Sequence, residues 1–245
     1  DENRLFELKK YPNFRSLVPL EDIETKFSNI YVHNHWGSME SRSGTGSTIK
    51  EAEAISVWLK ENLIKLGIKT IVDAACGDFN WMKVLLAKHK LYYIGWDIVD
   101  EVIKANKASY SNTRTKFEAK NIMTDKVPKA DIWLCRDCFI HFSYLDIHKT
   151  LQNFLDSNIP YILFSTYKND RDFKNRDIQT GDARVLNFFI FPFNFKENIN
   201  EIITEILNRN ISFENIGREY SRGKNKQYNE NLLILLDALR KYIII

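Results

Sequence analysis

Residues 70–81 constrain the fold of this chain more than any other stretch. They begin with an apolar run that predicts a buried strand, and the run ends in Asp73, small residues and Gly77. A helical pattern follows, and a second predicted strand at 92–96 ends in Asp97. A strand, a small-residue turn, a helix and a second strand closed by an acid are typical of the nucleoside-binding half of a doubly wound sheet.

Strand-like and helix-like segments alternate through the middle of the chain. The predicted strands cover 70–74, 91–96, 115–119, 130–135 and 160–166, and the predicted helices cover 80–89, 99–109 and 144–156. This alternation predicts an α/β fold with a mostly parallel, doubly wound sheet. A helix at 197–209 and an antiparallel hairpin of Ile211–Tyr220 with Leu232–Ala238 would complete a seven-stranded sheet.

Composition excludes few classes but points to an ordinary globular protein. The chain has 245 residues, and 44% of them are hydrophobic and 27% charged, which suits one substantial domain. A formal charge of +3 is too small to indicate nucleic acid or a membrane surface. Apolar runs stay short of the roughly 18–20 residues that cross a bilayer. The first residues do not read as a signal peptide, and three cysteines suit a reducing cytoplasm.

The turn after the first strand restricts the ligand. A dinucleotide site needs several glycines, so that the backbone can approach a pyrophosphate. Here one glycine, Gly77, is flanked by the carboxylates of Asp73 and Asp78, which disfavour phosphates. S-adenosylmethionine carries a sulfonium and an ammonium but no phosphate, and it fits this turn.

With these residues the sequence resembles the class I S-adenosylmethionine-dependent methyltransferases over roughly 48–240. The matching pieces are Val72-Asp-Ala-Ala-Cys-Gly77, Gly95-Trp-Asp97, Lys120-Asn-Ile122 and the strand Asp131-Ile-Trp-Leu-Cys-Arg-Asp137. The extended first motif, together with Cys135–His141 and Asn175–Asp182, looks like a bacterial subgroup of small-molecule or sugar O-methyltransferases. The resemblance implies the Rossmann-like methyltransferase fold.

The resemblance also implies roles for individual residues. Asp73 and Gly77 would border the methionine part of the cofactor, and Asp97 would accept hydrogen bonds from both ribose hydroxyls. Asn121 and Ile122 would flank the adenine; the family often has an acid at the first of these positions, so Asn121 is a departure. The full set of expected cofactor-binding residues is Trp36, Asp73, Ala75, Gly77, Asn80, Trp81, Asp97, Ile98, Asn121, Ile122 and Arg136.

The chain is expected to divide into a cap and a catalytic domain. Residues 1–47 contain a possible helix at 21–27 and then a segment too polar to fill a core, so we expect a lid over substrate and cofactor. Residues 48–245 would form the methyltransferase domain, with a loop insertion at 167–195.

The catalytic domain is expected to open with a helix at 48–66. Ser47 or Thr48 would be its N-cap, and Gly67 would end it.

Candidate catalytic residues follow the fourth predicted strand. Methyl transfer from a sulfonium is a direct displacement, so catalysis is alignment plus removal of a proton when the acceptor is a hydroxyl. His141 could be the general base, and Asp137 could orient it or take the proton itself. The alternative is that Asp137 caps the next turn and His141 is an ordinary helix residue. The sequence lacks the Asn/Asp-Pro-Pro-Tyr/Phe pattern that methyltransferases acting on amino groups of nucleic-acid bases carry at this place. Its absence argues against N-methylation of DNA or RNA.

Two polar segments, 33–47 and 169–187, are expected to form the acceptor site. Their candidate substrate-binding residues are His35, Arg42, Asn175, Arg176, Asp177, Asp182 and Arg184. Such side chains would suit a sugar, a nucleotide-sugar or a phosphorylated precursor of a surface polysaccharide or metabolite. A solvated surface loop is the alternative, but the insertion is longer than ordinary connections and follows the strand whose end borders the expected site.

A pair of cysteines and a basic cluster each allow a functional and a structural interpretation. Cys135 and Cys138 have the spacing of a zinc half-site, but no second such pair exists, and packing residues are the simpler reading, so no metal is expected. The basic cluster Arg218, Arg222, Lys224 and Lys226 reads most simply as a solvated turn, with nucleic-acid contact as the alternative.

The sequence therefore predicts a cytoplasmic O-methyltransferase, monomeric or homodimeric, that uses S-adenosylmethionine and a small polar acceptor. No membrane partner is expected, and nucleic acid is disfavoured. The rival functions are an RNA or protein methyltransferase and a non-catalytic adenosyl-binding module.

Overall fold

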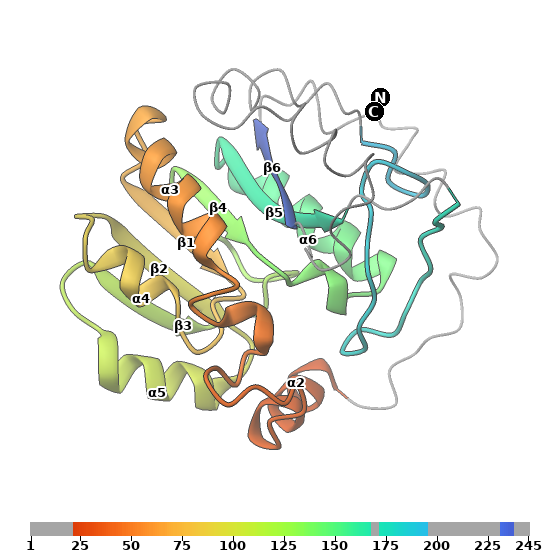
Figure 1. Cartoon of the computed structure of the whole chain (residues 1–245), viewed down its shortest axis with the longest axis horizontal. Helices are drawn as coiled ribbons and strands as arrows, with labels where there is room; N and C mark the ends of the chain where they lie inside the picture. The colour runs from red at the N-terminus through yellow and green to blue at the C-terminus, as the bar shows by residue number, and fades with distance from the viewer. Residues whose placement is uncertain (1–21, 168–171, 196–230, 238–245) are drawn as a thin grey trace.

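The computed structural model describes residues 22–167, 172–195 and 231–237, and one sheet dominates them (Figure 1). Its strands are β1 (Thr70–Ala74), β2 (Tyr92–Asp97), β3 (Thr115–Ala119), β4 (Ile132–Cys135), β5 (Tyr161–Tyr167) and β6 (Asn231–Asp237). They lie in the order β3-β2-β1-β4-β5-β6. The first five are parallel, and β6 is antiparallel to β5.

The strand bounds predicted from the sequence agree with those of the structure. All five predicted parallel strands are confirmed to within two residues. The central strands are nearly continuous apolar runs, as buried parallel strands usually are, whereas the edge strand β3 alternates buried and exposed residues. The second strand of the predicted hairpin is present as β6. The predicted strand 211–220, the predicted helix 197–209 and the basic cluster at 218–226 lie outside the described residues.

Helices flank the sheet on both faces, with α3 in front of it and α6 behind it in Figure 1. The helices are α2 (Ile23–Val32), α3 (Glu53–Lys65), α4 (Met82–Leu86), α5 (Asp100–Tyr110) and α6 (Tyr144–Ser157), with short 3₁₀ turns η3 (Thr45–Ser47) and η4 (Phe139–His141). Several of the largest buried side chains, among them Trp96, Trp133 and Phe164, come from the strands. The fold is therefore doubly wound, with its core on the central strands.

The start of α3 differs from the prediction. Its N-cap is Ala52 rather than Ser47 or Thr48. Thr48 does act as a cap, but of the single turn before α3: its Oγ1 accepts a hydrogen bond from the Glu51 amide at 3.3 Å. The predicted end is confirmed, because Gly67 adopts φ +68° and Ile68 N donates to Leu63 O at 2.8 Å.

The helix α2 begins near the predicted position and continues further. Asp22 caps it, with Oδ2 accepting from Thr25 N at 3.2 Å, and the helix runs on to Val32 rather than ending at 27. Ile23, Phe27 and Tyr31 recur every four residues along it, so they share one face. That face lines the pocket described below.

The strand order fixes where a ligand can bind. The chain runs outward from β1 to β3 and then returns to place β4 on the other side of β1. Ligands of such sheets bind at the carboxyl ends of the strands where the order reverses. In this chain that point lies between β1 and β4.

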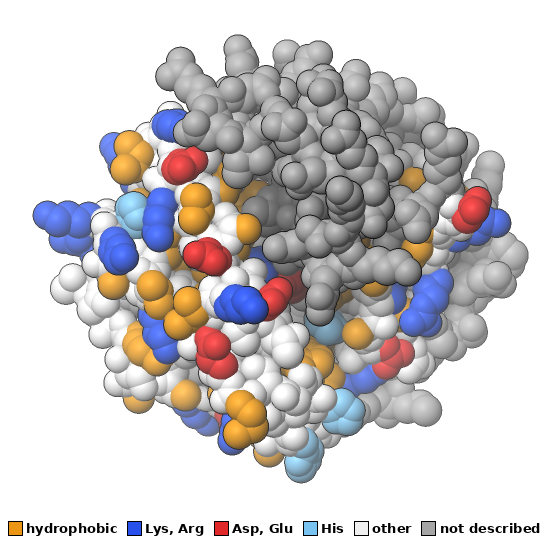
Figure 2. Space-filling view, in the orientation of Figure 1, with side chains coloured by type: hydrophobic (Ala, Val, Ile, Leu, Met, Phe, Trp, Pro, Cys, Tyr) orange, Lys and Arg blue, Asp and Glu red, His pale blue; other side chains and the backbone are white. Residues whose placement is uncertain are grey.

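The described surface mixes both signs of charge. In Figure 2, Lys and Arg side chains are interspersed with Asp and Glu side chains over the described part of this face. Among the described helices, none combines the length and the apolar character needed to cross a bilayer.

Candidate functional site

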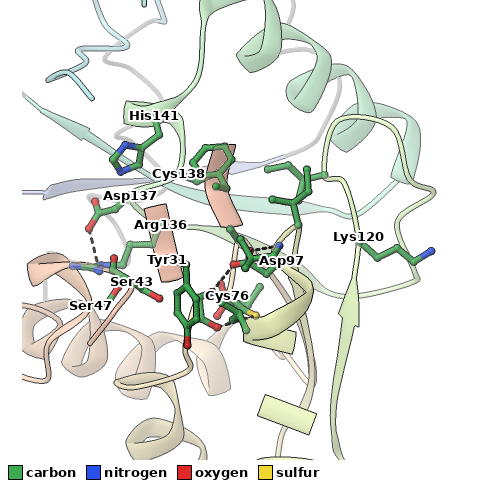
Figure 3. A pocket seen from close by; sticks show the side chains of 18 of the residues that line it. Tyr31, Ser43, Ser47, Cys76, Asp97, Lys120, Arg136, Asp137, Cys138 and His141 are labelled. Atoms are coloured by element: carbon green, nitrogen blue, oxygen red, sulfur yellow. Dashed lines mark hydrogen bonds and ion pairs between the residues drawn. The ribbon is translucent and has the colours of Figure 1, made fainter. Parts of the chain in front are cut away.

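A pocket opens at the reversal point of the sheet, with cap, first-motif and β4 residues around it (Figure 3). It is lined by Ile23, Phe27, Tyr31, Trp36, Ser43, Ser47, Asp73, Ala75, Cys76, Gly77, Trp81, Asp97, Ile98, Val99, Val102, Lys120, Asn121, Ile122, Met123, Arg136, Asp137, Cys138, His141 and Phe142. Both predicted catalytic residues are in this lining, and so are all predicted cofactor-binding residues except Asn80. Their roles stay predictions, but the structure brings them together.

The turn after β1 requires a glycine. Gly77 adopts φ +55°, and a Cβ there would collide with Ser43 of the cap. Its amide donates to Asp97 Oδ2 at 2.9 Å, and its carbonyl accepts from Asn106 Nδ2 at 2.8 Å. Gly77 is therefore held between β2, α5 and the cap.

Asp97 is a buried carboxylate at the end of β2. Besides Gly77, the Val99 amide donates to it, to Oδ1 at 3.0 Å. Burial raises the pKa of Asp97, and the backbone donors Val99 and Gly77 oppose that rise. Each carboxylate oxygen can accept more than one hydrogen bond, so the ribose role predicted for Asp97 is stereochemically open to it.

Asp73, at the end of β1, is more strongly perturbed. Tyr93 donates its hydroxyl to Asp73 Oδ2 at 2.6 Å. Burial raises the pKa of Asp73 to about 7, and the Tyr93 hydrogen bond only partly offsets this. A cation beside Asp73 would favour its ionised form, so the site suits an ammonium or a sulfonium.

Asn121 begins the loop after β3. Its side-chain Oδ1 accepts a hydrogen bond from Met123 N at 2.9 Å, and its backbone N–H donates to Asp125 Oδ2 at 2.7 Å. The asparagine therefore shapes a local turn in place of the acid that the family often has there.

The cap is tied to the first motif by hydrogen bonds that span more than 30 residues of sequence. Asp78 accepts from Ser41 Oγ and Arg42 N, both at 2.9 Å, and the Asp78 amide donates to Ser43 Oγ at 2.8 Å. Asn80 donates to Glu40 Oε1 at 2.7 Å. This explains why Asn80 does not line the pocket: its amide is used to hold the cap.

Arg136 carries a guanidinium that the protein satisfies only in part. Its Nη1 donates to Gly46 O at 2.9 Å and pairs with Asp137 Oδ2 at 3.1 Å, and the group lies over the Trp81 ring at 5.6 Å. Its Nε and Nη2 are buried, and no described residue accepts from them. Buried donors without acceptors are costly, so this group is suited to an anionic part of a ligand.

Asp137 has an unusual backbone conformation, with φ +50°. Its amide donates to Ser165 Oγ at 3.0 Å, and Tyr167 donates its hydroxyl to Asp137 Oδ1 at 3.5 Å. Residues other than glycine rarely adopt this backbone region, and those that do concentrate at functional sites. The carboxylate pairs with Arg136 and Tyr167, so the turn-capping alternative for Asp137 does not describe its contacts.

His141 ends η4, and its ring contacts Trp36 of the cap in a tilted arrangement. Its ring lies 5.0 Å from the Trp36 ring, centroid to centroid, and its Nδ1 is 3.0 Å from Asp182 O. Burial lowers the pKa of His141, which keeps the ring neutral and able to accept a proton near neutral pH. In Figure 3, His141 lies beside Asp137 on the side of the pocket away from Asp97.

The residues predicted to bind the acceptor are placed differently: none of the seven lines the pocket. His35 and Arg42 are exposed on the cap. Asn175 donates to Asn187 O and Phe191 O within the insertion. Their assignment to acceptor binding stays a prediction, because the structure gives it no geometric support.

Three of these residues hold the insertion to the segment after β4 or to α2. Asp177 Oδ1 accepts from Tyr144 N at 2.7 Å at the start of α6. Arg184 is buried, and it donates to the carbonyls of Phe139, Ile140 and Arg176. Asp182 pairs with Lys26 of α2 at 3.2 Å. Polar loop composition here reflects backbone groups that must be satisfied when a loop packs against a domain.

Several pocket residues were missed from the sequence. Ile23, Phe27 and Tyr31 could have been found from their spacing of four on a helix. Ser43, Ser47 and Phe142 had no comparable local signal, because they reach the pocket only through tertiary packing.

All three cysteines are free and buried. Burial raises the pKa of Cys76 and of Cys135 well above the usual value, which disfavours the thiolate that binds metals. The described residues contain no cluster of three metal-ligating side chains. Their burial is what the packing interpretation expects, and the absence of a metal stays a prediction.

Comparison with known proteins places the fold. No protein-family model matches the chain, and no curated protein matches it in sequence. Human N-acetylserotonin methyltransferase in complex with SAM superposes with a TM-score of 0.50 at 13% identity, over 77% of this chain and 54% of that one. Magnesium protoporphyrin IX methyltransferase from Synechocystis PCC 6803 with bound SAH gives 0.47 at 15% identity, over 76% and 88%.

The chain thus has the α/β fold of the class I methyltransferases, and the resemblance noted in its motifs is confirmed at the level of the fold. It spans about half the length of the human enzyme. At this identity the likeness defines the architecture, and the activity has to be argued from the site.

Proposed function

We propose that the protein is an S-adenosylmethionine-dependent methyltransferase that methylates a hydroxyl group of a small acceptor. One observation carries the proposal: a pocket at the reversal point of the sheet combines carboxylates at the ends of β1 and β2 with the half-satisfied guanidinium of Arg136. The methionine end of the cofactor is itself zwitterionic, with an ammonium, a sulfonium and a carboxylate. The two charge patterns are complementary.

The cofactor would lie across the ends of β1 to β4. Asp97 would bind the ribose, and the loop at 121–123 would flank the adenine. Asp73 would face the ammonium, and Arg136 would bind the carboxylate in a charge-assisted hydrogen bond. In this arrangement the sulfonium methyl would point toward the residues after β4.

The chemistry supplied by the bound cofactor is a methyl group on a positively charged sulfur. His141 is the proposed base, since it is neutral and lines the pocket, and Asp137 is the alternative base or its electrostatic partner. Because the leaving sulfur departs neutral, no acid is needed. The protein's contribution is alignment and proton removal.

Sugars, nucleotide-sugars and phosphorylated precursors of surface polysaccharides or metabolites are the first acceptors to test. The polar side chains that line the pocket beside the cap and after β4, Ser43, Ser47, Asp137 and His141, motivate this class. We expect a monomer or homodimer, with no membrane or nucleic-acid partner, and the free thiols of all three cysteines support a reducing compartment.

Calorimetry with three ligands tests cofactor binding. S-adenosylhomocysteine should bind, and 5′-methylthioadenosine, which lacks the amino-acid end, should bind at least tenfold more weakly, since one charge-assisted hydrogen bond accounts for about that factor. ATP serves as the control for adenosine binding in general, and it should not bind. Failure of S-adenosylhomocysteine to bind would sink the proposal.

Transfer of a labelled methyl group to a panel of hydroxyl acceptors tests the reaction. His141→Ala and Asp137→Ala should both lose turnover and keep cofactor affinity, whereas unchanged turnover in both would remove the base assignment. Cofactor binding without transfer to any acceptor, peptide or RNA would favour a non-catalytic adenosyl-binding module. Transfer to tRNA or to a peptide at physiological salt would favour the nucleic-acid or protein alternative.

A further inference from the structure

The insertion wraps the segment that carries His141. Within 177–184, Thr180 Oγ1 accepts from Ser143 N at 2.9 Å and donates to Asp146 Oδ2 at 2.6 Å. Gly181 N donates to His141 O at 2.8 Å, and Arg184 N donates to Ile140 O at 3.1 Å. Together with the Asp177 and Arg184 side-chain bonds, these contacts follow residues 139–146 on both sides of His141.

One contact of this segment decides the state of the imidazole. The Asp182 carbonyl can only accept a hydrogen bond, so the atom of His141 that faces it at 3.0 Å, Nδ1, must carry the hydrogen. In a neutral ring the other nitrogen, Nε2, then holds the lone pair. No described residue donates to Nε2, and the His141 side chain lines the pocket.

The same segment touches the cap. Lys26 of α2 pairs with Asp182, and its aliphatic chain lies across Gly181, where a Cβ would come within 2.5 Å of Lys26 Cδ and Cε. Gly181 also adopts φ +100°. The position therefore accommodates only glycine while Lys26 stays where it is.

We propose that the segment 177–184 is a positioning element that fixes His141 as the Nδ1–H tautomer and leaves Nε2 free to accept the acceptor's proton. The proposal rests on the proposed function, because only a hydroxyl acceptor supplies that proton. In the step, the acceptor oxygen forms a bond to the methyl carbon as the carbon–sulfur bond breaks. The bonding electrons go to sulfur, which becomes a neutral thioether, and the hydroxyl proton goes to Nε2.

The tautomer can be observed without knowing the acceptor. Long-range ¹H–¹⁵N correlation spectra of histidine-labelled protein distinguish protonated from unprotonated ring nitrogens. The chain has five histidines, and His141→Gln assigns the signal. The expected result is Nδ1–H for His141 in the wild-type protein.

Gly181→Ala should displace the Asp182 carbonyl and lower the Nδ1–H to Nε2–H ratio by roughly two- to twelvefold, the effect of one net hydrogen bond. Gly67→Ala is the matched control: it also replaces a glycine at positive φ, but at the end of α3, with no atom within 4 Å of the new Cβ. The control should leave the His141 signal unchanged. Unchanged signals from the other four histidines would show that Gly181→Ala is folded.

A second variant covers the case in which Gly181→Ala does not fold. Thr180→Val keeps the side-chain volume and removes the hydrogen bonds to Ser143 N and Asp146 Oδ2 that hold the segment beside His141, so it should lower the Nδ1–H to Nε2–H ratio by roughly two- to twelvefold. An Nε2–H signal in the wild type, or a folded Gly181→Ala or Thr180→Val with the wild-type signal, would overturn the inference. An Nδ1–H signal in a protein that fails to bind S-adenosylhomocysteine would instead reject the proposed function and leave the positioning role intact.

Discussion

The two halves of the pocket differ in how their polar residues are used. On the side of β1 and β2, Asp73 and Asp97 stand directly at strand ends, and both line the pocket. On the side of β4 and the insertion, the polar residues predicted to bind the acceptor donate to or accept from backbone groups instead. Polar residues at strand ends of a parallel sheet thus indicate a site, whereas polar residues of a long insertion indicate first that the insertion is packed.

Asp97→Ala should have the largest effect on ligand binding. It removes the acceptor for two backbone amides and for the ribose, so cofactor affinity should fall about 100-fold or more, since hydrogen bonds to charged groups are worth roughly 1.5–3 kcal/mol each. Calorimetry with S-adenosylhomocysteine measures the change, and Asp97→Asn, which keeps the shape, should lose less. An affinity that survives Asp97→Ala would show that the β2 end is not part of the cofactor site.

Arg184→Met should destabilise the insertion on the β4 side of the pocket without removing any contact to the ligand. Three backbone carbonyls lose a buried donor, so the free energy of unfolding should fall by about 2–4 kcal/mol, as measured by urea denaturation. Cofactor affinity of the folded fraction should stay unchanged. Val185→Ala, at an exposed neighbouring position, is the control. If Arg184→Met lost ligand binding but kept its stability, Arg184 would belong to the ligand-binding site after all.

Asp73→Asn should change the pH dependence of stability. Burial raises the pKa of Asp73 to about 7 in the folded protein, against about 3.9 when unfolded. Between these values the folded state keeps a proton that the unfolded state has lost, so this group lowers stability as pH rises through the window. The variant should therefore gain stability relative to the wild type from pH 4 to 7, by at most about 4 kcal/mol.

Thermal unfolding across this pH range measures the difference. Because the asparagine side chain of the variant can still accept from Tyr93, the local hydrogen bond is kept, and Tyr93→Phe reports its separate contribution. A difference between variant and wild type that does not change with pH would contradict the assignment of the shift to Asp73.

Asp78→Ala should have the smallest effect. It removes the acceptor for Ser41 and Arg42 of the cap, and cofactor affinity should fall about three- to tenfold, because about 1 kcal/mol of cap contact is lost. Asp131→Ala is a matched control. Asp131 also accepts two hydrogen bonds, from the Lys69 and Thr70 amides, but at the opposite end of β1. Asp131→Ala should lose stability and keep its affinity for the cofactor. Equal cofactor affinities in Asp78→Ala and Asp131→Ala would show that the cap contacts of Asp78 do not contribute to cofactor binding.

The sequence predicted the sheet and the strand-end acids because both depend on local pattern. Apolar runs mark buried parallel strands, and Asp73, Gly77 and Asp97 follow them at once. The contacts of the cap could not be predicted in the same way, since Ser41 and Asp78 are 37 residues apart. The role of Arg184 could not be predicted either. The sequence shows an arginine in a polar loop, and that pattern is the same whether the side chain binds a substrate or donates to backbone carbonyls, as it does here.

The serine of the cap that rests on Gly77 has a consequence for the time course of binding. Ser43 lines the pocket and its hydroxyl accepts a hydrogen bond from the Asp78 amide, so a ligand that needs the cap to move must wait for this hydrogen bond to break. Association would then wait for the cap to open, and its rate would level off at high ligand concentration instead of rising in proportion. The same contacts would prolong the stay of the spent cofactor, so its release would limit the rate of successive turnovers.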